Sequence, residues 1–166
     1  ALARSEARLQ LALDGSGCGV WDWDLQQHRC DFSSGIGRML HYSGDNLERD
    51  FRFASRLHES ERESVVAALR RAMASGELWV DTMRLLCYDG TYRWFMASGQ
   101  CVRNAQGQAE RFAGVLADIS DEREAQERQR LASTVVANSM EGVLVTDAYS
   151  RILSANAAVT RLLGYT

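Results

Sequence analysis

The period of the apolar positions changes several times along this chain, and each stretch of constant period predicts an element. Two tryptophans alternate with aspartates over 18–24, which predicts a strand, and 28–32 predict its partner after a short turn. Residues 60–75 carry apolar side chains at helical spacing, with Ser60 and Glu63 as a capping box and a glycine just beyond the end. We therefore expect two short strands followed, after a loop, by a helix.

In the second half of the chain the apolar residues again alternate with polar ones, as they do over 18–24. Residues 78–88 and 91–103 predict two strands joined at Asp89-Gly90, a strong hairpin signal, and 109–119 predict a third. Two early and three late strands give one five-stranded antiparallel sheet, with the intervening helices on one face. The expected fold class is therefore α+β.

Helical segments flank this core on both sides. Leu2, Leu9 and Leu13 stand among charged residues in 1–15, which predicts an amphipathic N-terminal flanking helix. The helix expected over 121–138 is so rich in charge that it cannot bury much of its surface. It either connects two domains through solvent or pairs with another helix.

Residues 139–166 repeat residues 16–43 without a gap, at a spacing of 123 residues. Seven positions are identical, namely Ser16, Gly19, Val20, Asp24, Arg38, Leu40 and Tyr42, which recur as Ser139, Gly142, Val143, Asp147, Arg161, Leu163 and Tyr165. This spacing is the size of a whole small domain. We expect a flanking helix at 1–15, a domain at 16–120, a linker helix at 121–138 and a truncated second domain at 139–166.

Composition and charge exclude several classes of function. The chain is 46% hydrophobic and 25% charged, which is typical of globular proteins. Its net charge is −3, and the sequence shows no cluster of basic residues of the kind that binds nucleic acid. Its apolar runs fall short of the ~20 residues of a membrane span, no signal peptide is visible, and the four cysteines lack metal or redox spacing. We expect a reduced, cytoplasmic chain without direct contact to nucleic acid or membrane.

Five segments stand in order along the chain: GVWDWDL at 19–25, SSGIGRMLHYS at 33–43, LHESER at 57–62, MRLLCYDGTYRW at 83–94 and GVLADISDERE at 114–124. Together they resemble the PAS domain family, in the form with a C-terminal PAC-type motif that occurs in bacterial sensors. His41 stands where the family often has glycine, and Glu59 where it often has proline. The resemblance spans about 5–120, and the second copy has Asn156 where the family commonly places asparagine.

The resemblance implies a PAS fold and a sensory or dimerisation module. A small ligand would bind in a cavity between the sheet and its helices, and the C-terminal helix would pass the change to an output domain. Tandem copies resemble the sensory halves of bacterial cyclic-di-GMP enzymes, the expected output, and of histidine kinases, the alternative. The implied assembly is a homodimer through the flanking helices and the outer sheet face.

Ten apolar side chains are candidates for lining that cavity: Trp21, Trp23, Ile36, Met39, Met83, Leu85, Trp94, Met96, Phe112 and Leu116. The alternative is that they only fill a core, as large apolar side chains commonly do. A shift of one residue in a strand inverts the face of every side chain on it, so each assignment depends on the register. A cavity on the order of hundreds of Å³ would favour a sensor, and a close-packed interior would favour a ligand-free scaffold.

The sequence identifies no cofactor, metal site or catalytic group. The spacing of the three histidines, His28, His41 and His58, is not that of a metal site. The segment around His58 resembles a sequence motif of the PAS family that is not a haem-binding motif. The sequence lacks the Gly-x-Asn-Cys-Arg-Phe motif of flavin photoreceptors. Noncovalent binding of a flavin stays an alternative, because tryptophan side chains can stack on its ring. Without a catalytic triad or phosphate loop, we expect a regulatory chain rather than an enzyme.

Asp118, Ile119 and Arg84 are the candidates for relaying a signal from the domain to the helix at 121–138. Asp118 ends the last strand, so its carboxylate can cap the following helix. A salt bridge between the domain and Asp118 would transmit a conformational change of the domain to the helix at 121–138. Simple helix capping is the alternative.

Two stretches predict exposed apolar surface. Leu86, Cys87 and Tyr88 are consecutive in a strand, so at least one lies on the outer face of the sheet, which favours a partner there. In the second copy, the strand expected at 142–147 would have an unpaired edge. It should be disordered, join another sheet or swap between protomers.

Overall fold

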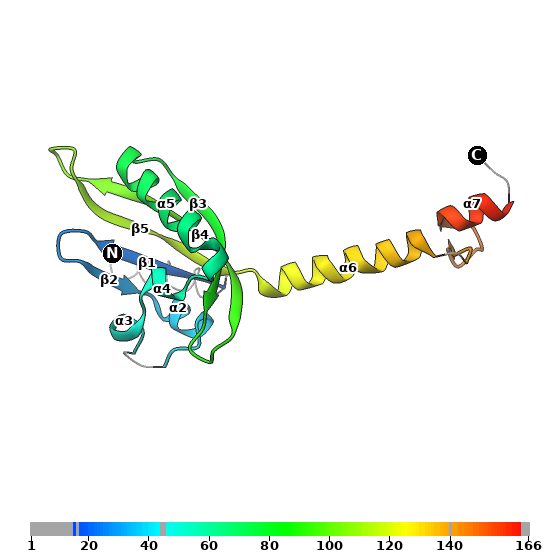
Figure 1. Ribbon diagram of the computed structural model, residues 1–166, viewed down its shortest axis with the longest axis horizontal. Coiled ribbons are helices and arrows are strands. Elements are labelled where there is room, and N and C mark those ends of the chain that lie inside the picture. Colours follow the sequence, from blue (N-terminus) through cyan, green and yellow to red (C-terminus); the bar gives the residue numbers. More distant parts are fainter. Residues whose placement is uncertain (1–14, 16, 44–45, 140, 164–166) are drawn as a thin grey trace. The chain divides into compact units, whose positions relative to one another are not determined.

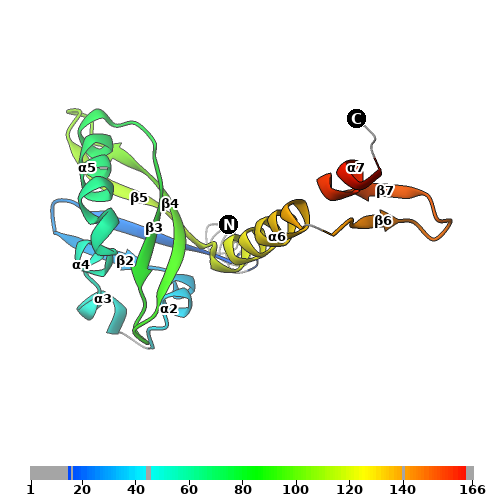
Figure 2. The ribbon, with the colours of Figure 1, turned by 45° about the vertical axis from the view of Figure 1, so that its right-hand side comes forward.

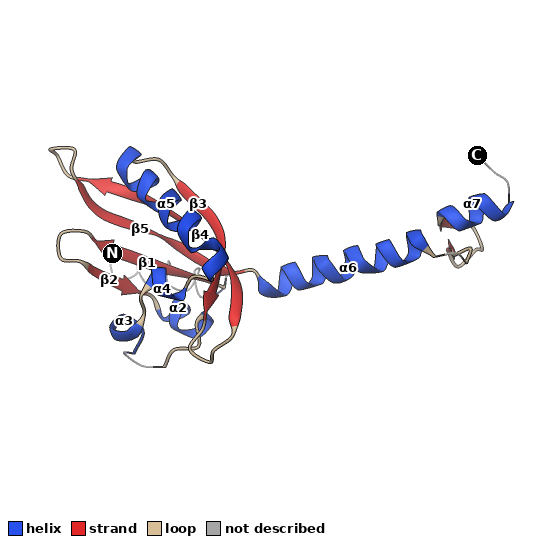
Figure 3. Cartoon of the chain, in the orientation of Figure 1, coloured by secondary structure: helices blue, strands red, loops and turns tan. Residues whose placement is uncertain are grey.

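The computed structural model describes residues 15, 17–43, 46–139 and 141–163 (Figure 1). These residues form two compact units, 1–120 and 121–166, which are described separately. The flanking helix expected at 1–15 lies outside the described residues except for Gly15. Helices and strands are both present in the first unit, which confirms the α+β class (Figure 3).

The first unit is a five-stranded antiparallel sheet, as the sequence predicts. Its strands run in the order β2-β1-β5-β4-β3, with bounds β1 Cys18–Asp24, β2 Arg29–Phe32, β3 Trp79–Leu86, β4 Tyr92–Arg103 and β5 Ala109–Asp118. Between β2 and β3 the chain forms four helices that cover one face of the sheet (Figure 1): α2 Ser34–Met39, α3 Asn46–Asp50, α4 Phe53–Arg56 and α5 Glu59–Ser75.

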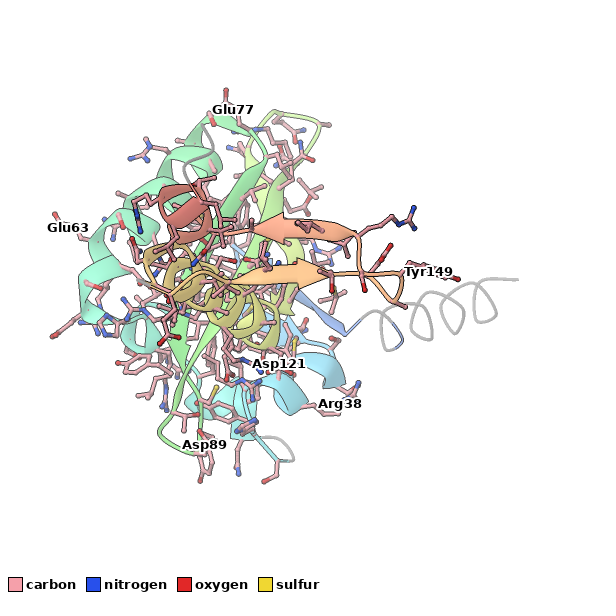
Figure 4. All side chains as sticks on the ribbon, turned by 90° about the vertical axis from the view of Figure 1, so that its right-hand side faces the viewer. Arg38, Glu63, Glu77, Asp89, Asp121 and Tyr149 are labelled. Carbon is pink, nitrogen blue, oxygen red and sulfur yellow. The ribbon has the colours of Figure 1, made fainter. Side chains whose placement is uncertain are left out.

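Local sequence explains where the main elements stop. The β3–β4 turn places Gly90 at φ 84° and lets the Asp89 carboxylate accept from the Thr91 amide at 2.9 Å. Asp89 lies at the tip of this hairpin (Figure 4). Helix α5 ends at Gly76, whose φ of 79° suits glycine and whose N–H bonds to the carbonyl of Ala72.

The start of α5 differs from the prediction. The N-cap is His58 rather than Ser60, because the His58 ring nitrogen accepts from the Ser60 amide at 3.3 Å and the helix begins at Glu59. The Ser60–Glu63 capping box was therefore wrong by two residues, although the predicted helix itself is present.

The second unit repeats the beginning of the first. It contains α6 from its second residue on and the hairpin and helix that follow (Figure 2), with bounds α6 Ser120–Asn138, β6 Leu144–Thr146, β7 Ile152–Ala155 and α7 Ala157–Leu163. The order β6-β7-α7 is that of β1-β2-α2, and β7 begins and ends 123 residues after β2. None of the described helices is long and apolar enough to span a membrane.

The strands of the second unit leave their apolar side chains open to solvent. Leu144 and Val145 of β6 are 47% and 50% exposed, and Ile152 and Leu153 of β7 are 64% and 66% exposed. This matches the exposure expected of Leu144 and Val145, whereas Val143, also expected to be exposed, is half-buried. Strand exchange between protomers stays a prediction.

Candidate functional site

The indole of Trp21 occupies the space above the middle of the sheet in the first unit. Trp21, Gly114, Gly99 and Trp79 stand in register across four neighbouring strands, so they share one face. A Cβ atom added to Gly99 or to Gly114 would lie 2.6 Å from Cζ2 of Trp21. The indole also packs against Phe112, with ring centroids 5.2 Å apart, and edge-on against Trp79 at 6.3 Å. The glycines thus make room for a tryptophan, which fills the region where a cavity was expected.

Eight of the ten candidate lining residues lie on this inner face or on α2. Five are buried, with exposures of 5% or less: Ile36, Met83, Leu85, Phe112 and Leu116. Trp21 and Met39 are half-buried against this core, and Trp23 is half-buried on the same face of β1 as Trp21. Whether any of them binds a ligand stays a prediction.

Trp94 and Met96 were assigned to the wrong face. Phe95 and Ala97 are the buried residues of this part of β4, so their neighbours project from the opposite side of the sheet. Met96 is 43% exposed, and the Trp94 ring lies under the guanidinium of Arg84, 5.1 Å from its centroid. The sequence could not decide the face, because β4 has apolar residues on both sides.

One polar group stands out inside this core. Trp79 is 5% exposed, and its Nε1 donor has no hydrogen-bond partner within the described part of the chain. The ring is enclosed by Trp21, Phe53 and Phe112. A buried indole N–H normally finds an acceptor, so this position suits a water molecule or one polar atom of a small ligand.

Buried side chains and the Trp21 indole pack in the region between the sheet and its helices. Whether a flavin or a haem binds there stays a prediction. The histidines lie elsewhere: His28 is exposed in the β1–β2 turn, His41 pairs with Asp89 at 2.5 Å, and His58 caps α5. Among the described residues, no group of three His, Cys, Asp or Glu side chains could hold a metal ion.

The junction of β5 with α6 is held by several polar contacts. Asp118 pairs with Arg93 of β4 at 2.8 Å, and its other oxygen accepts from the Ser120 amide at 2.9 Å. The Ser120 hydroxyl accepts from the Trp94 amide at 2.9 Å, and the Ile119 amide donates to the Trp94 carbonyl at 2.9 Å. Asp118 therefore both caps the start of α6 and bridges it to β4.

Arg84 donates hydrogen bonds to α5, and its guanidinium lies over the ring of Trp94, whose backbone belongs to the junction; its role as a relay residue stays a prediction. Its amide and its Nε each donate to the Glu61 carboxylate of α5 at 2.8 Å, so Arg84 joins α5 to β3. Burial acts to raise the pKa of Glu61, but the hydrogen bonds and charge of Arg84 outweigh it and hold that pKa below its ordinary value.

Sequence reasoning missed Arg93, the cation that Asp118 binds. Phe95 stands opposite Asp118 in the register, and Arg93 lies two residues further along the same face of β4. That proximity depends on the pairing of two strands separated by a turn. The turn at 104–107, which joins β4 to β5, could have suggested it only together with the exact register of the two strands.

Comparison with known families agrees with this architecture. A family model described as "PAS fold" matches residues 29–116, more than half of the chain. The chain belongs to the PAS family. A second model, described as "PAS domain", matches residues 129–166, where the PAS repeat begins again.

Two curated relatives of this PAS chain are much longer than the chain itself. The Sensor protein FixL of Bradyrhizobium diazoefficiens is 25% identical over 160 residues, which cover 94% of the chain and 32% of FixL. The Non-motile and phage-resistance protein of Caulobacter vibrioides is 30% identical over 159 residues, which cover 92% of the chain and 19% of that protein. The chain thus spans a third or less of these relatives.

Solved structures show the same fold. A sensory box histidine kinase/response regulator from Burkholderia thailandensis has a TM-score of 0.63 at 23% identity, covering 76% of this chain and 95% of that one. The N-terminal domain of a diguanylate cyclase with PAS/PAC sensor from Marinobacter aquaeolei has a TM-score of 0.57 at 23% identity, covering 64% and 98%. As a PAS domain related to a sensor protein, the chain is a regulatory module of signal transduction.

Proposed function

We propose that residues 16–120 pass their conformational state to a downstream output domain through the β5–α6 junction. The observation that carries this proposal is the pair of contacts that Asp118 makes, to Arg93 of β4 and to the first turn of α6. Because the Trp94 backbone holds Ile119 and Ser120 as well, a shift of β4 has to move the start of α6 with it.

Asp118→Asn in the longer protein that contains this chain tests the relay. The substitution removes the charge that binds Arg93 but keeps an oxygen to cap α6, so the domain should fold while the output activity changes severalfold. Glu122→Gln, on an exposed residue of the same helix, is the matched control. Output activity equal to wild type in both variants would rule out the relay at Asp118.

We further propose that the first PAS domain works with a filled interior and no large cofactor. The Trp21 indole over Gly99 and Gly114 supports this, because an emptied cavity would require that ring to leave. Purified protein should be colourless, and native mass spectrometry should give the mass of the chain alone. A visible absorbance band from a stoichiometric cofactor would refute the proposal.

A second candidate function is the sensing of a small polar ligand. The unpartnered Nε1 of Trp79 favours it, since a ligand atom that accepts this hydrogen bond would satisfy a buried donor. Trp79→Phe removes that donor while keeping an aromatic ring. An added small-molecule mass in the wild-type protein that is absent from Trp79→Phe would support this candidate over the filled interior.

We propose a homodimer in which the outer sheet face of one PAS domain meets a second copy. Val80 of β3 and Met96 of β4 are 58% and 43% exposed on neighbouring strands of that face. Met96→Glu should shift analytical ultracentrifugation from dimer to monomer, whereas Gln106→Glu in the β4–β5 turn should not. A wild-type monomer would exclude this assembly.

For the output domain we propose a cyclic-di-GMP enzyme or a histidine kinase, in a cytoplasmic position. Both kinds of protein occur among the structural neighbours by their descriptions. Assays of the longer protein for GTP turnover to cyclic-di-GMP and for autophosphorylation from ATP separate the two.

A further inference from the structure

Asn156 stands between β7 and α7 in the second unit, and its side chain makes four hydrogen bonds. Its Oδ1 accepts from the Val143 amide at 2.9 Å and from the Val159 amide at 3.3 Å. Its Nδ2 donates to the carbonyls of Val136 and Glu141, both at 2.9 Å. The residue is only 7% exposed, so these bonds are shielded from water.

The four partners belong to different parts of the unit. Val136 lies in the last turn of α6, where helix carbonyls have no partner inside the helix. Val159 lies in the first turn of α7, where amides lack one. One side-chain amide therefore caps the end of α6 and the start of α7 together.

The first repeat offers a comparison inside the same chain. Ser33 is the equivalent residue, and its Oγ accepts from the Val20 amide at 2.9 Å, as Oδ1 of Asn156 does from Val143. Its backbone amide also donates to the Val20 carbonyl at 2.8 Å, as that of Asn156 does to Val143 at 3.0 Å. A hydroxyl has a single hydrogen to donate, so Ser33 cannot make the two donations that Asn156 makes.

We propose that Asn156 is a positioning residue that joins α6 to the second repeat as one body. A displacement of the last turn of α6 is then passed to Val143, the residue before β6, and to α7, because the same amide bonds to all three. This inference rests on the proposed role of α6 as a relay, and it names the point where the relay enters the second PAS repeat.

Residual dipolar couplings of the 166-residue chain test this inference. In the wild type, amides of 121–138 and of 144–163 should fit a single alignment tensor. Asn156→Ser should keep the bond to the Val143 amide, as Ser33 does with Val20, and lose at least one of the two donations, because a hydroxyl has a single hydrogen. The two segments should then need separate tensors, and amide exchange in the last turn of α6 should become roughly tenfold faster.

Thr160→Ala is the matched control, since it removes a hydroxyl that bonds only within α7, to the Ala157 carbonyl at 2.9 Å. It should leave one tensor. If the two segments of the wild type need separate alignment tensors, the inference is wrong. This measurement needs no variant, so the inference can be tested even if Asn156→Ser does not fold. A single tensor in a folded Asn156→Ser would overturn it too. If Asn156→Ser separates the segments but Asp118→Asn leaves the output activity unchanged, the proposed relay at Asp118 is wrong. The proposed connection of α6 to the second repeat by Asn156 is then still supported.

Discussion

Trp21 decides how much room the interior of the first PAS domain leaves, because its indole lies over Gly99 and Gly114. Gly99→Ala forces a methyl group against that ring and should destabilise the domain by about 2 kcal/mol, as overpacking of a core does. In a Trp21→Leu background the same substitution should cost much less, since the ring atoms that clash are gone. Urea denaturation of the four chains of this double-mutant cycle gives both costs. Equal costs in the two backgrounds would mean that Trp21 does not fill this space.

His41 departs from the family's usual glycine, and its backbone shows the consequence. Its φ is 62°, in the left-handed region that costs a residue with a Cβ roughly 1–2 kcal/mol. Its imidazole ring forms an ion pair with Asp89, which lies in the β3–β4 turn. His41→Ala loses this pair and keeps the strain, whereas His41→Gly loses the pair and relieves the strain.

His41→Gly should therefore be more stable than His41→Ala by about 1 kcal/mol in equilibrium unfolding. Asp89→Asn serves as the control, because it removes the same pair without changing the backbone at 41. If the glycine variant is the less stable of the two, the left-handed conformation at His41 carries no strain.

At the scale of elements, the bond between Glu61 and Arg84 attaches the first turn of α5 to β3. The Glu61 side chain is 19% exposed and that of Arg84 31%, so the pair is partly shielded. The folded-state pKa of Glu61 lies below its ordinary value, so its contribution to stability is present above pH ~4.3 and is lost as the pH falls through that lowered pKa.

Glu61→Gln should lower the free energy of unfolding by about 1–2 kcal/mol at pH 7. The difference from wild type should shrink as the pH drops below about 4. Glu63→Gln is the control, because Glu63 of the same helix points into solvent (Figure 4). A difference that is the same at pH 7 and pH 3 would contradict the assigned charge state of Glu61.

The sequence predicts the elements well and their contacts less well. The strand at 18–24 and the end of α5 at Gly76 follow from alternation and from one glycine, both local signals. The face of β4 and the Arg93–Asp118 pair depend on the register between strands, which no single stretch of sequence encodes. The filling of the interior likewise appears only when two glycines from different strands meet one indole.

At the scale of the whole molecule, the two units differ sharply in what they bury. In the described part of the second unit the buried residues are Asn156, Ala158 and Val159, whereas the first unit encloses a core of aromatic and aliphatic side chains. A short hairpin with one open face is marginally stable in water. The second unit should therefore unfold at a lower denaturant concentration than the first.

The four tryptophans make this difference measurable, because all of them lie in the first unit, between Trp21 and Trp94. Tryptophan fluorescence should report one late transition in urea, while far-ultraviolet circular dichroism should add an earlier one from α6 and the second repeat. A chain that ends at Ser120 should give coincident curves by both probes. An early transition that moves to higher urea with protein concentration would indicate that the open strands Leu144–Thr146 and Ile152–Ala155 pair between copies. Coincident curves in the 166-residue chain would show that the second unit gains its stability from the first, against the division into two independent units.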